Sequence, residues 1–177
     1  KWVNEPNYNK VIFGTSSTEA LNRIIFGIDW KEGDNVYISP FEHNSIIRPL
    51  EKVKELYNIN IKVIEFDKET WDINEELEDQ FAINRPKCIF MSSKSNVCGY
   101  KLPFKKVFEM GKKYSSINVL DASQSFGIDK KINNINTDFI VFAGHKSLYA
   151  TFGVAGFIIT GDYKLKVTIF GGTGSDS

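Results

Sequence analysis

The chain has few cysteines, no excess of charge and no long apolar run. Its 177 residues include two cysteines, Cys88 and Cys98, whose spacing fits neither a disulfide framework nor a metal site. The 22 basic residues equal the 22 acidic ones, so we expect no nucleic-acid or anionic-membrane partner, because such partners attract surplus basic charge. No apolar run is long enough to span a bilayer and no secretory signal opens the chain, so we expect a cytoplasmic protein.

Short apolar strands alternate with helical patterns along the chain, whose length suggests a single domain. This alternation predicts an α/β fold with a mostly parallel sheet and helices on both faces. The last strand follows its predecessor too soon for a crossover helix, so it should run antiparallel. We expect Pro103 at the first position of its helix. The predicted strands are residues 11–14, 35–39, 61–66, 88–93, 117–123, 138–144 and 154–160, and the predicted helices are residues 17–28, 44–57, 73–82 and 103–115.

Polar side chains follow several predicted strands directly. His43, Asn96, Asp121 and Lys146 each lie at or just beyond the carboxyl end of a strand, so all four should face one edge of the sheet, where ligands bind in such folds. Lysine is rarely buried unless it is paired or used chemically. The stretch "GTSSTEALN" places hydroxyls and N–H groups at a helix N-terminus, which can seat an anion.

Each of these features also has an ordinary structural explanation. "GTSSTE" by itself fits a capping box formed by Ser16 and Glu19. An aspartate after a strand is more often a turn residue or a helix cap, and His43 alone would be a surface or packing histidine. Taken together, however, the group supplies a lysine, a carboxylate, a flat ring and a phosphate seat. Pyridoxal 5'-phosphate requires that set, because it is held as a lysine Schiff base with an acidic partner at its pyridine nitrogen.

Five stretches resemble the class V aminotransferase family, and among its members the cysteine desulfurases and selenocysteine lyases most closely. They are "TEALN", "EHNSIIRPL", "SNVCGYKLP", "DASQSFG" and "FAGHKSLY", and they follow the family's order over nearly the whole chain. The resemblance implies the large domain of a fold-type I pyridoxal-phosphate-dependent transferase, with a mixed seven-stranded sheet. It also implies that residues 1–177 form one such domain, without the N-terminal segment and the C-terminal small domain of these enzymes.

The resemblance also assigns roles to individual residues. Lys146 matches the Schiff-base lysine, Asp121 the carboxylate beside the pyridine nitrogen, and His43 the histidine stacked on the cofactor ring; these three form the expected catalytic set. The other expected cofactor contacts are Ser17 and Thr18 in the phosphate-binding turn, Asn96 near the cofactor, Gln124 at the ring's phenolic oxygen, and His145 as a further phosphate contact. No metal is expected.

The chain also departs from the family pattern. Ala143 stands where many relatives have a phosphate-binding serine, and "LYATFG" replaces "LYGPTG" after the lysine. The family's carboxylate-binding arginine and persulfide-forming cysteine are not found in this chain, so we expect the chain alone to be poorly active.

Three readings of the function remain open. The first is a desulfurase-like enzyme that removes sulfur or selenium from an amino acid, with cysteine favoured. A homodimer and a sulfur-acceptor protein are its expected partners. The second is a class V aminotransferase with another amino-acid substrate. The third is a non-catalytic or nucleotide-binding α/β fragment. The absence of GxGxxG after the first strand and of a P-loop lysine disfavours that third reading.

Overall fold

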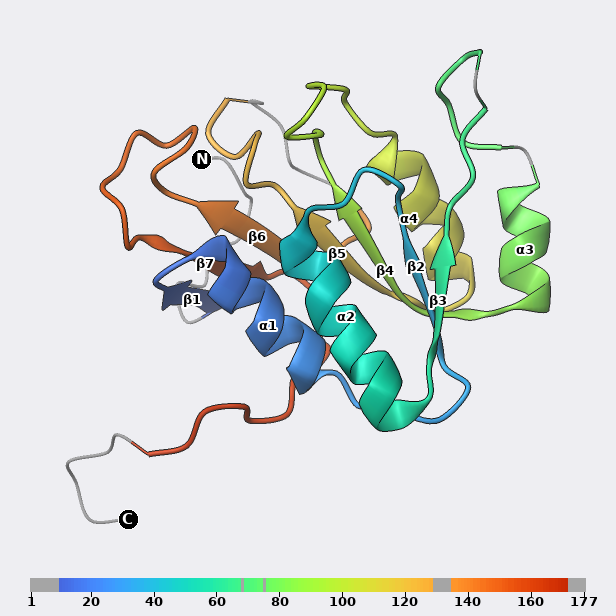
Figure 1. Cartoon of the computed structure of the whole chain (residues 1–177), viewed down its shortest axis with the longest axis horizontal. Coiled ribbons are helices and arrows are strands. Elements are labelled where there is room, and N and C mark those ends of the chain that lie inside the picture. The colour runs from blue at the N-terminus through green and yellow to red at the C-terminus, as the bar shows by residue number, and fades with distance from the viewer. Residues whose placement is uncertain (1–9, 68, 75, 129–134, 172–177) are drawn as a thin grey trace.

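Strands and helices alternate along the chain in the computed structural model, which describes residues 10–67, 69–74, 76–128 and 135–171 (Figure 1). The elements in chain order are β1 (Val11–Gly14), α1 (Ser17–Gly27), β2 (Asn35–Ile38), α2 (Asn44–Tyr57), β3 (Asn60–Val63), α3 (Leu77–Ile83), β4 (Pro86–Ser92), α4 (Phe104–Lys113), β5 (Ile117–Asp121), β6 (Phe139–Ala143) and β7 (Ala155–Ile159).

All seven strands belong to one mixed sheet, in the order β1-β7-β6-β5-β4-β2-β3. Every neighbouring pair from β6 to β3 is parallel, whereas β7 runs antiparallel to both β6 and β1. The predicted seven-stranded sheet and its antiparallel last strand are therefore confirmed. Because β1 and β6 both oppose β7, they run in the same direction, and β1 ends at the same edge of the sheet as the parallel strands. This edge, where β1, β2, β4, β5 and β6 end, is called the carboxyl rim below.

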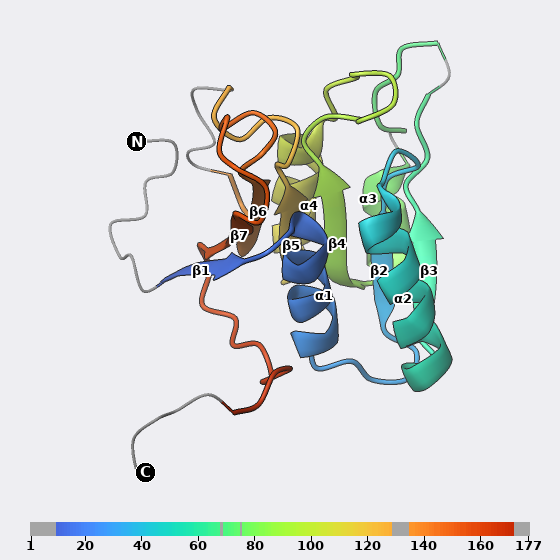
Figure 2. The same cartoon turned by 60° about the vertical axis from the view of Figure 1, so that its left-hand side comes forward.

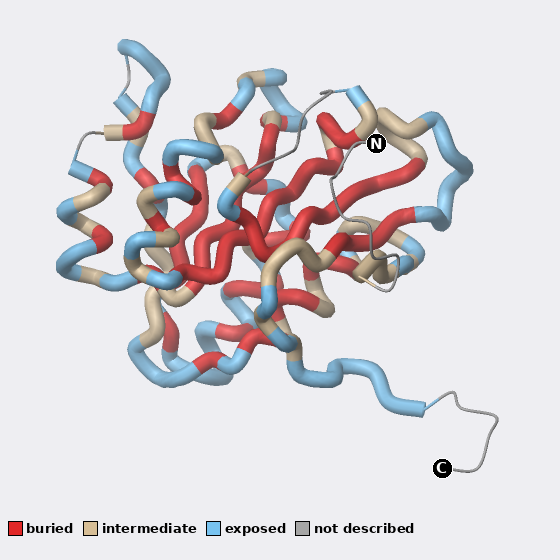
Figure 3. Tube along the Cα trace, turned by 180° about the vertical axis from the view of Figure 1, so that it is seen from behind, coloured by how far each residue is buried: buried red, intermediate tan, exposed pale blue. Residues whose placement is uncertain are grey.

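Helices cover both faces of the sheet, as predicted (Figures 1 and 2). Alternate residues of β4 show the two layers. Cys88 and Phe90 belong to the core that contains the apolar residues of α1 and α2, whereas Ile89 and Met91 belong to the core that contains those of α3 and α4. Figure 3 shows the central strands buried between these layers. No described helix has the length and apolar character needed to cross a bilayer.

The chain between β3 and α3 differs from the sequence prediction. The expected strand over residues 61–66 ends at Val63, and Phe66 instead forms a single antiparallel bridge with Ile73. The turn between them is held by Asp67 Oδ1, which accepts hydrogen bonds from the N–H groups of Glu69 and Thr70 at 2.9 and 2.7 Å. The predicted helix start at residue 73 was therefore wrong, because Ile73 is part of this hairpin.

The start of α4 also differs. Pro103 is the N-cap residue rather than the first helical residue, because its backbone, at φ −79° and ψ 45°, is not helical. The preceding Leu102 donates its N–H to the Ser93 carbonyl at 3.2 Å, which holds the chain in a turn up to that point.

Candidate active site

Asp121 is buried at the carboxyl end of β5 and begins a tight turn. Its Oδ1 accepts a hydrogen bond from the Ser123 N–H at 2.9 Å, and its carbonyl accepts one from the Ser93 N–H at 2.9 Å. The first bond fixes the carboxylate over the turn, and the second ties the turn to the end of β4. Gln124 lies in the same turn and is partly buried. The structure therefore places the predicted pair, Asp121 and Gln124, on one short segment at the carboxyl rim.

Lys146 lies in the turn that follows β6 and is partly buried. Its turn is fastened to the Asp121 turn, because Ser147 Oγ donates a hydrogen bond to the Phe126 carbonyl at 2.6 Å. The rings of Phe126 and Phe142 stack at 5.2 Å beside this bond. Within the described part of the chain, the Lys146 amine forms no ion pair. The structure thus brings the turn that carries Lys146 against the segment that carries Asp121 and Gln124, and the Lys146 amine has no ion-pair partner among the described residues.

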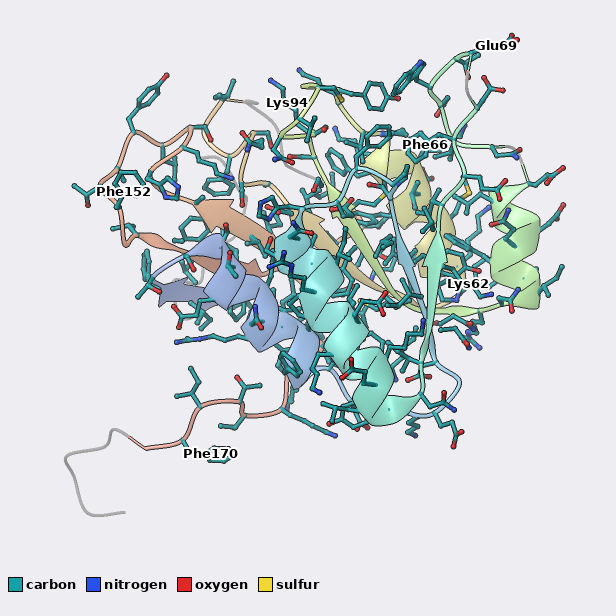
Figure 4. The ribbon with its side chains drawn as sticks, viewed as in Figure 1. Lys62, Phe66, Glu69, Lys94, Phe152 and Phe170 are labelled. Carbon is teal, nitrogen blue, oxygen red and sulfur yellow. The ribbon has the colours of Figure 1, made fainter. Side chains whose placement is uncertain are left out.

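His145 precedes Lys146 and is partly buried. Its ring stacks on Phe152 with 4.8 Å between centroids and 23° between planes. Figure 4 shows Phe152 at the outer edge of the molecule, on the loop between β6 and β7. This contact orders the loop, and the phosphate contact expected for His145 stays a prediction.

His43 caps the N-terminus of α2 with its ring exposed. Its Nδ1 accepts a hydrogen bond from the Ser45 N–H at 3.1 Å and lies 2.9 Å from Ser45 Oγ. A ring nitrogen that accepts from a backbone N–H carries no proton, so the neutral ring holds its proton on Nε2. The cap therefore fixes both the tautomer and the orientation of the imidazole at the rim.

The expected phosphate seat lies at the N-terminus of α1. Ser16 Oγ accepts from the Glu19 N–H at 3.1 Å, as in the predicted capping box, but the Glu19 carboxylate reaches Thr15 N and Oγ1, both at 2.7 Å, rather than the Ser16 N–H. The bonds from Thr15, together with Arg23, hold the pKa of Glu19 below its usual value. The N–H groups of Ser17 and Thr18 take no part in these bonds and stand at the positive end of the helix.

Thr18 and His43 line one cavity of about 500 Å³ between α1 and α2. The structure thus brings the expected phosphate turn and the expected ring-stacking histidine together. Asn96 lies on the exposed part of the loop that follows β4. Two bonds close this loop, from Ser95 N to the Tyr100 carbonyl at 2.9 Å and from Leu102 N to the Ser93 carbonyl at 3.2 Å. Asn96 is therefore held at the rim, and its contact with the cofactor stays a prediction.

Sequence reasoning missed Glu42, a carboxyl buried directly before His43. Glu42 Oε1 accepts from Ser39 Oγ at 2.5 Å and from Ser92 N at 2.8 Å, and Oε2 accepts from Ser92 Oγ at 2.6 Å. Burial raises the pKa of Glu42 to about 7; the bonds from Ser39 and Ser92 oppose this rise, and the nearby charge of Asp121 adds to it. Glutamate is usually exposed, so the residue type did not predict a buried carboxyl at this position. Ser39 follows β2 and Ser92 ends β4, but no local sequence pattern links either residue to Glu42.

A cluster of four aromatic rings also escaped prediction. Phe41 contacts Phe66, Trp71 and Tyr100, with ring centroids 5.5, 5.8 and 5.7 Å away. The Tyr100 hydroxyl donates to the Trp71 carbonyl. The cluster joins the loop before His43 to the hairpin that Phe66 begins (labelled in Figure 4) and to the loop that carries Asn96.

One buried hydroxyl provides a test of whether a cofactor fits this site. Ser123 Oγ is buried beside Asp121 and has no hydrogen-bond partner among the described residues. A buried donor without a partner is costly, so its position suits a ligand that brings an acceptor. The donor set of the rim also fits pyridoxal 5'-phosphate: an amine, a carboxylate, an imidazole and free helix N–H groups. The described residues contain no cluster of His, Cys, Asp and Glu that could hold a metal ion.

Comparison with known proteins agrees with this donor set. The family model for class V aminotransferases matches residues 1–176. The chain belongs to the class V aminotransferase family. Among curated members, a probable cysteine desulfurase of Pyrococcus abyssi is 27% identical over 151 residues, which cover 83% of this chain and 37% of that protein. The hercynylcysteine sulfoxide lyase of Schizosaccharomyces pombe is 21% identical, over 79% of this chain and 36% of that protein.

Several solved structures share the fold of this chain. The apo cysteine desulfurase of Thermococcus onnurineus NA1 superposes with a TM-score of 0.85 at 23% identity, over 94% of this chain and 42% of that one. The C-DES K223A mutant, with glycine covalently linked to its PLP cofactor, superposes with a TM-score of 0.82 at 19% identity. The match covers 93% of this chain and 45% of that one. The fold-type I architecture is thereby confirmed. The chain spans less than half the length of these relatives.

Proposed function

We propose that this chain is the cofactor-binding part of a pyridoxal-phosphate-dependent enzyme of the cysteine desulfurase type, which removes sulfur or selenium from an amino acid. The observation that carries the proposal is the fastening of the Lys146 turn to the Asp121 turn by the Ser147–Phe126 hydrogen bond at 2.6 Å. This bond joins the turn of Lys146 to the segment that holds the buried Asp121 carboxylate and the unpartnered Ser123 hydroxyl, which supports a shared site. The cysteine desulfurases among the curated relatives support cysteine as the substrate.

Each rim residue has a defined task in this proposal. When bound, the cofactor supplies an electron sink for bonds at the substrate's α-carbon. Asp121 is the anion that keeps a proton on the pyridine nitrogen, because a nearby negative charge favours the protonated form. His43, fixed by Ser45, presents the face of its ring to the cofactor. Lys146 binds the cofactor covalently, and the N–H groups of Ser17 and Thr18 hold its phosphate.

A second copy of the chain is the partner proposed for the rim. Large apolar side chains are exposed on the segments that follow its strands, among them Val97, Ile128, Tyr149 and Phe152. Exposed apolar patches of this kind mark interaction surfaces. A sulfur-acceptor protein is the second proposed partner. We further propose a cytoplasmic location, which is supported by the two free cysteines.

A related class V reaction on another sulfur-containing substrate is the alternative. It is favoured by the similarity to the hercynylcysteine sulfoxide lyase of Schizosaccharomyces pombe. Release of alanine from cysteine by the enzyme that contains this chain, with the sulfur recovered as sulfide once an added thiol reduces the persulfide, would separate the two, since only the desulfurase reaction yields alanine from that substrate.

Titration with pyridoxal 5'-phosphate tests the cofactor assignment. We expect the wild-type chain to develop an absorbance band that borohydride abolishes, and the Lys146→Ala variant to develop none. Lys94→Ala is the matched control, because Lys94 is also a partly buried lysine at the rim (Figure 4). A band of equal strength in the Lys146→Ala variant would overturn the proposal.

A further inference from the structure

Glu42 joins two parts of the rim that come from distant parts of the chain. It lies between the end of β2 and the start of α2, directly before His43. Its side chain is buried, and the carboxyl accepts two bonds from Ser92, at the end of β4, and one from Ser39. All three donors point at one carboxyl group, so this group fixes the distance between the loop that carries His43 and the end of β4.

The same bonds link Glu42 to Asp121. Ser92 and Asp121 are paired in the parallel register of β4 and β5, and the next residue, Ser93, donates its N–H to the Asp121 carbonyl at 2.9 Å. The loop that carries His43 is therefore connected to Asp121 by the hydrogen bonds of one side chain, Glu42, to the end of β4, and by the bond from that strand end to Asp121. Neither contact depends on the exposed surface, since Ser39, Glu42, Ser92 and Asp121 are all buried.

We propose that Glu42 is a positioning residue: its carboxyl fastens the loop that carries His43 to the end of β4, and so sets where the His43 ring stands relative to Asp121. In the enzyme this spacing determines whether one flat cofactor can touch the imidazole with its face and the carboxylate with its ring nitrogen. The statement about cofactor contacts rests on the proposed function. The placement of the His43 imidazole by Glu42 does not, because it is a property of the chain without cofactor.

Two variants and a control test the proposal in the full 177-residue chain. Glu42→Ala removes the group, whereas Glu42→Gln keeps its size and an acceptor for Ser92 N. Glu51→Gln repeats the second substitution at an exposed site of α2. The first measurement is the ring signals of His43 in the ¹H–¹⁵N NMR spectrum without cofactor, assigned with a His43→Gln variant. We expect them to shift in Glu42→Ala and to stay close to wild type in Glu42→Gln and Glu51→Gln.

The second measurement is the dissociation constant for pyridoxal 5'-phosphate. We expect a rise of about tenfold or more in Glu42→Ala, which is the scale of one lost buried hydrogen bond, and recovery in Glu42→Gln. A merely structural residue would change the melting temperature without moving the His43 signals. If Glu42→Ala does not fold, it is replaced by Ser92→Ala, for which the expectations are the same. This variant removes the Ser92 hydroxyl, one of the three donors to Glu42, and leaves Ser39 Oγ and the Ser92 N–H in place.

The outcomes separate this proposal from the proposed function. Unchanged His43 signals in a folded Glu42→Ala or Ser92→Ala variant overturn the positioning role, whatever the cofactor does. Failure of the wild-type chain to bind cofactor overturns the proposed function, while the His43 signals still decide whether Glu42 places that ring.

Discussion

Replacing Glu42 by glutamine should flatten part of the pH dependence of stability. Burial raises the pKa of Glu42 from the ordinary 4.5 to about 7. The folded chain therefore binds this proton more tightly than the unfolded chain does. The free energy of unfolding is then greatest below about pH 4.5 for this group and falls as the pH rises to about 7, where the folded carboxyl ionises as well. The pKa difference corresponds to a loss of about 3 kcal/mol.

This loss is measured by urea unfolding of the wild-type and Glu42→Gln chains at several pH values between about 4.5 and 8. Glutamine stays neutral, so the variant should gain about 3 kcal/mol relative to wild type across this range, and other titrating groups cancel in the comparison. Glu51→Gln, at an exposed site of the neighbouring helix α2, should track the wild type. Parallel curves for wild type and Glu42→Gln would refute the claim that burial keeps a proton on Glu42.

Three further substitutions have definite expected outcomes. Gly156→Ala should cost about 1–3 kcal/mol in urea unfolding, since the added Cβ would clash with the Ile12 carbonyl and push β1 from β7; an unchanged free energy of unfolding would contradict this. Ser123→Ala should leave the cofactor-free chain as stable or more stable by about 1 kcal/mol while weakening cofactor binding; equal affinity would show that the buried hydroxyl meets no ligand. Asp138→Asn should cost about 1–3 kcal/mol, because Asp138 accepts from Lys112 at 2.7 Å and from the Asn118 N–H at 2.8 Å; a loss below the error of the measurement would contradict this.

The strands and the rim could be predicted because local patterns encode them. Continuous apolar runs such as residues 139–142 mark strands buried on both faces, and polar residues such as Asp121 and Lys146 lie at or within a few residues of the ends of such strands. Parallel strands then bring those residues to one edge whatever the details of the loops. The seven strands, the antiparallel β7 and the co-location of Thr18 with His43 follow from that reasoning.

The parts that were missed depend on contacts between distant segments. Phe66 was placed in a strand because its local pattern alternates, but its partner Ile73 and the Asp67 turn end that strand early. Glu42 is buried because Ser92, 50 positions away in sequence, supplies two of its hydrogen bonds. No pattern within the loop "SPFEHN" records such a partner. The ring cluster around Phe41 escaped for the same reason, since its members come from three separate loops.

Mapping the lysine that carries the cofactor tests the central claim most directly. The wild-type chain is incubated with pyridoxal 5'-phosphate, reduced with borohydride, digested and analysed by peptide mass spectrometry. We expect the adduct on the peptide that contains Lys146, because the Ser147–Phe126 bond joins the turn of Lys146 to the segment that carries Asp121. A stoichiometric adduct on any other lysine, with Lys146 unmodified, would contradict the account.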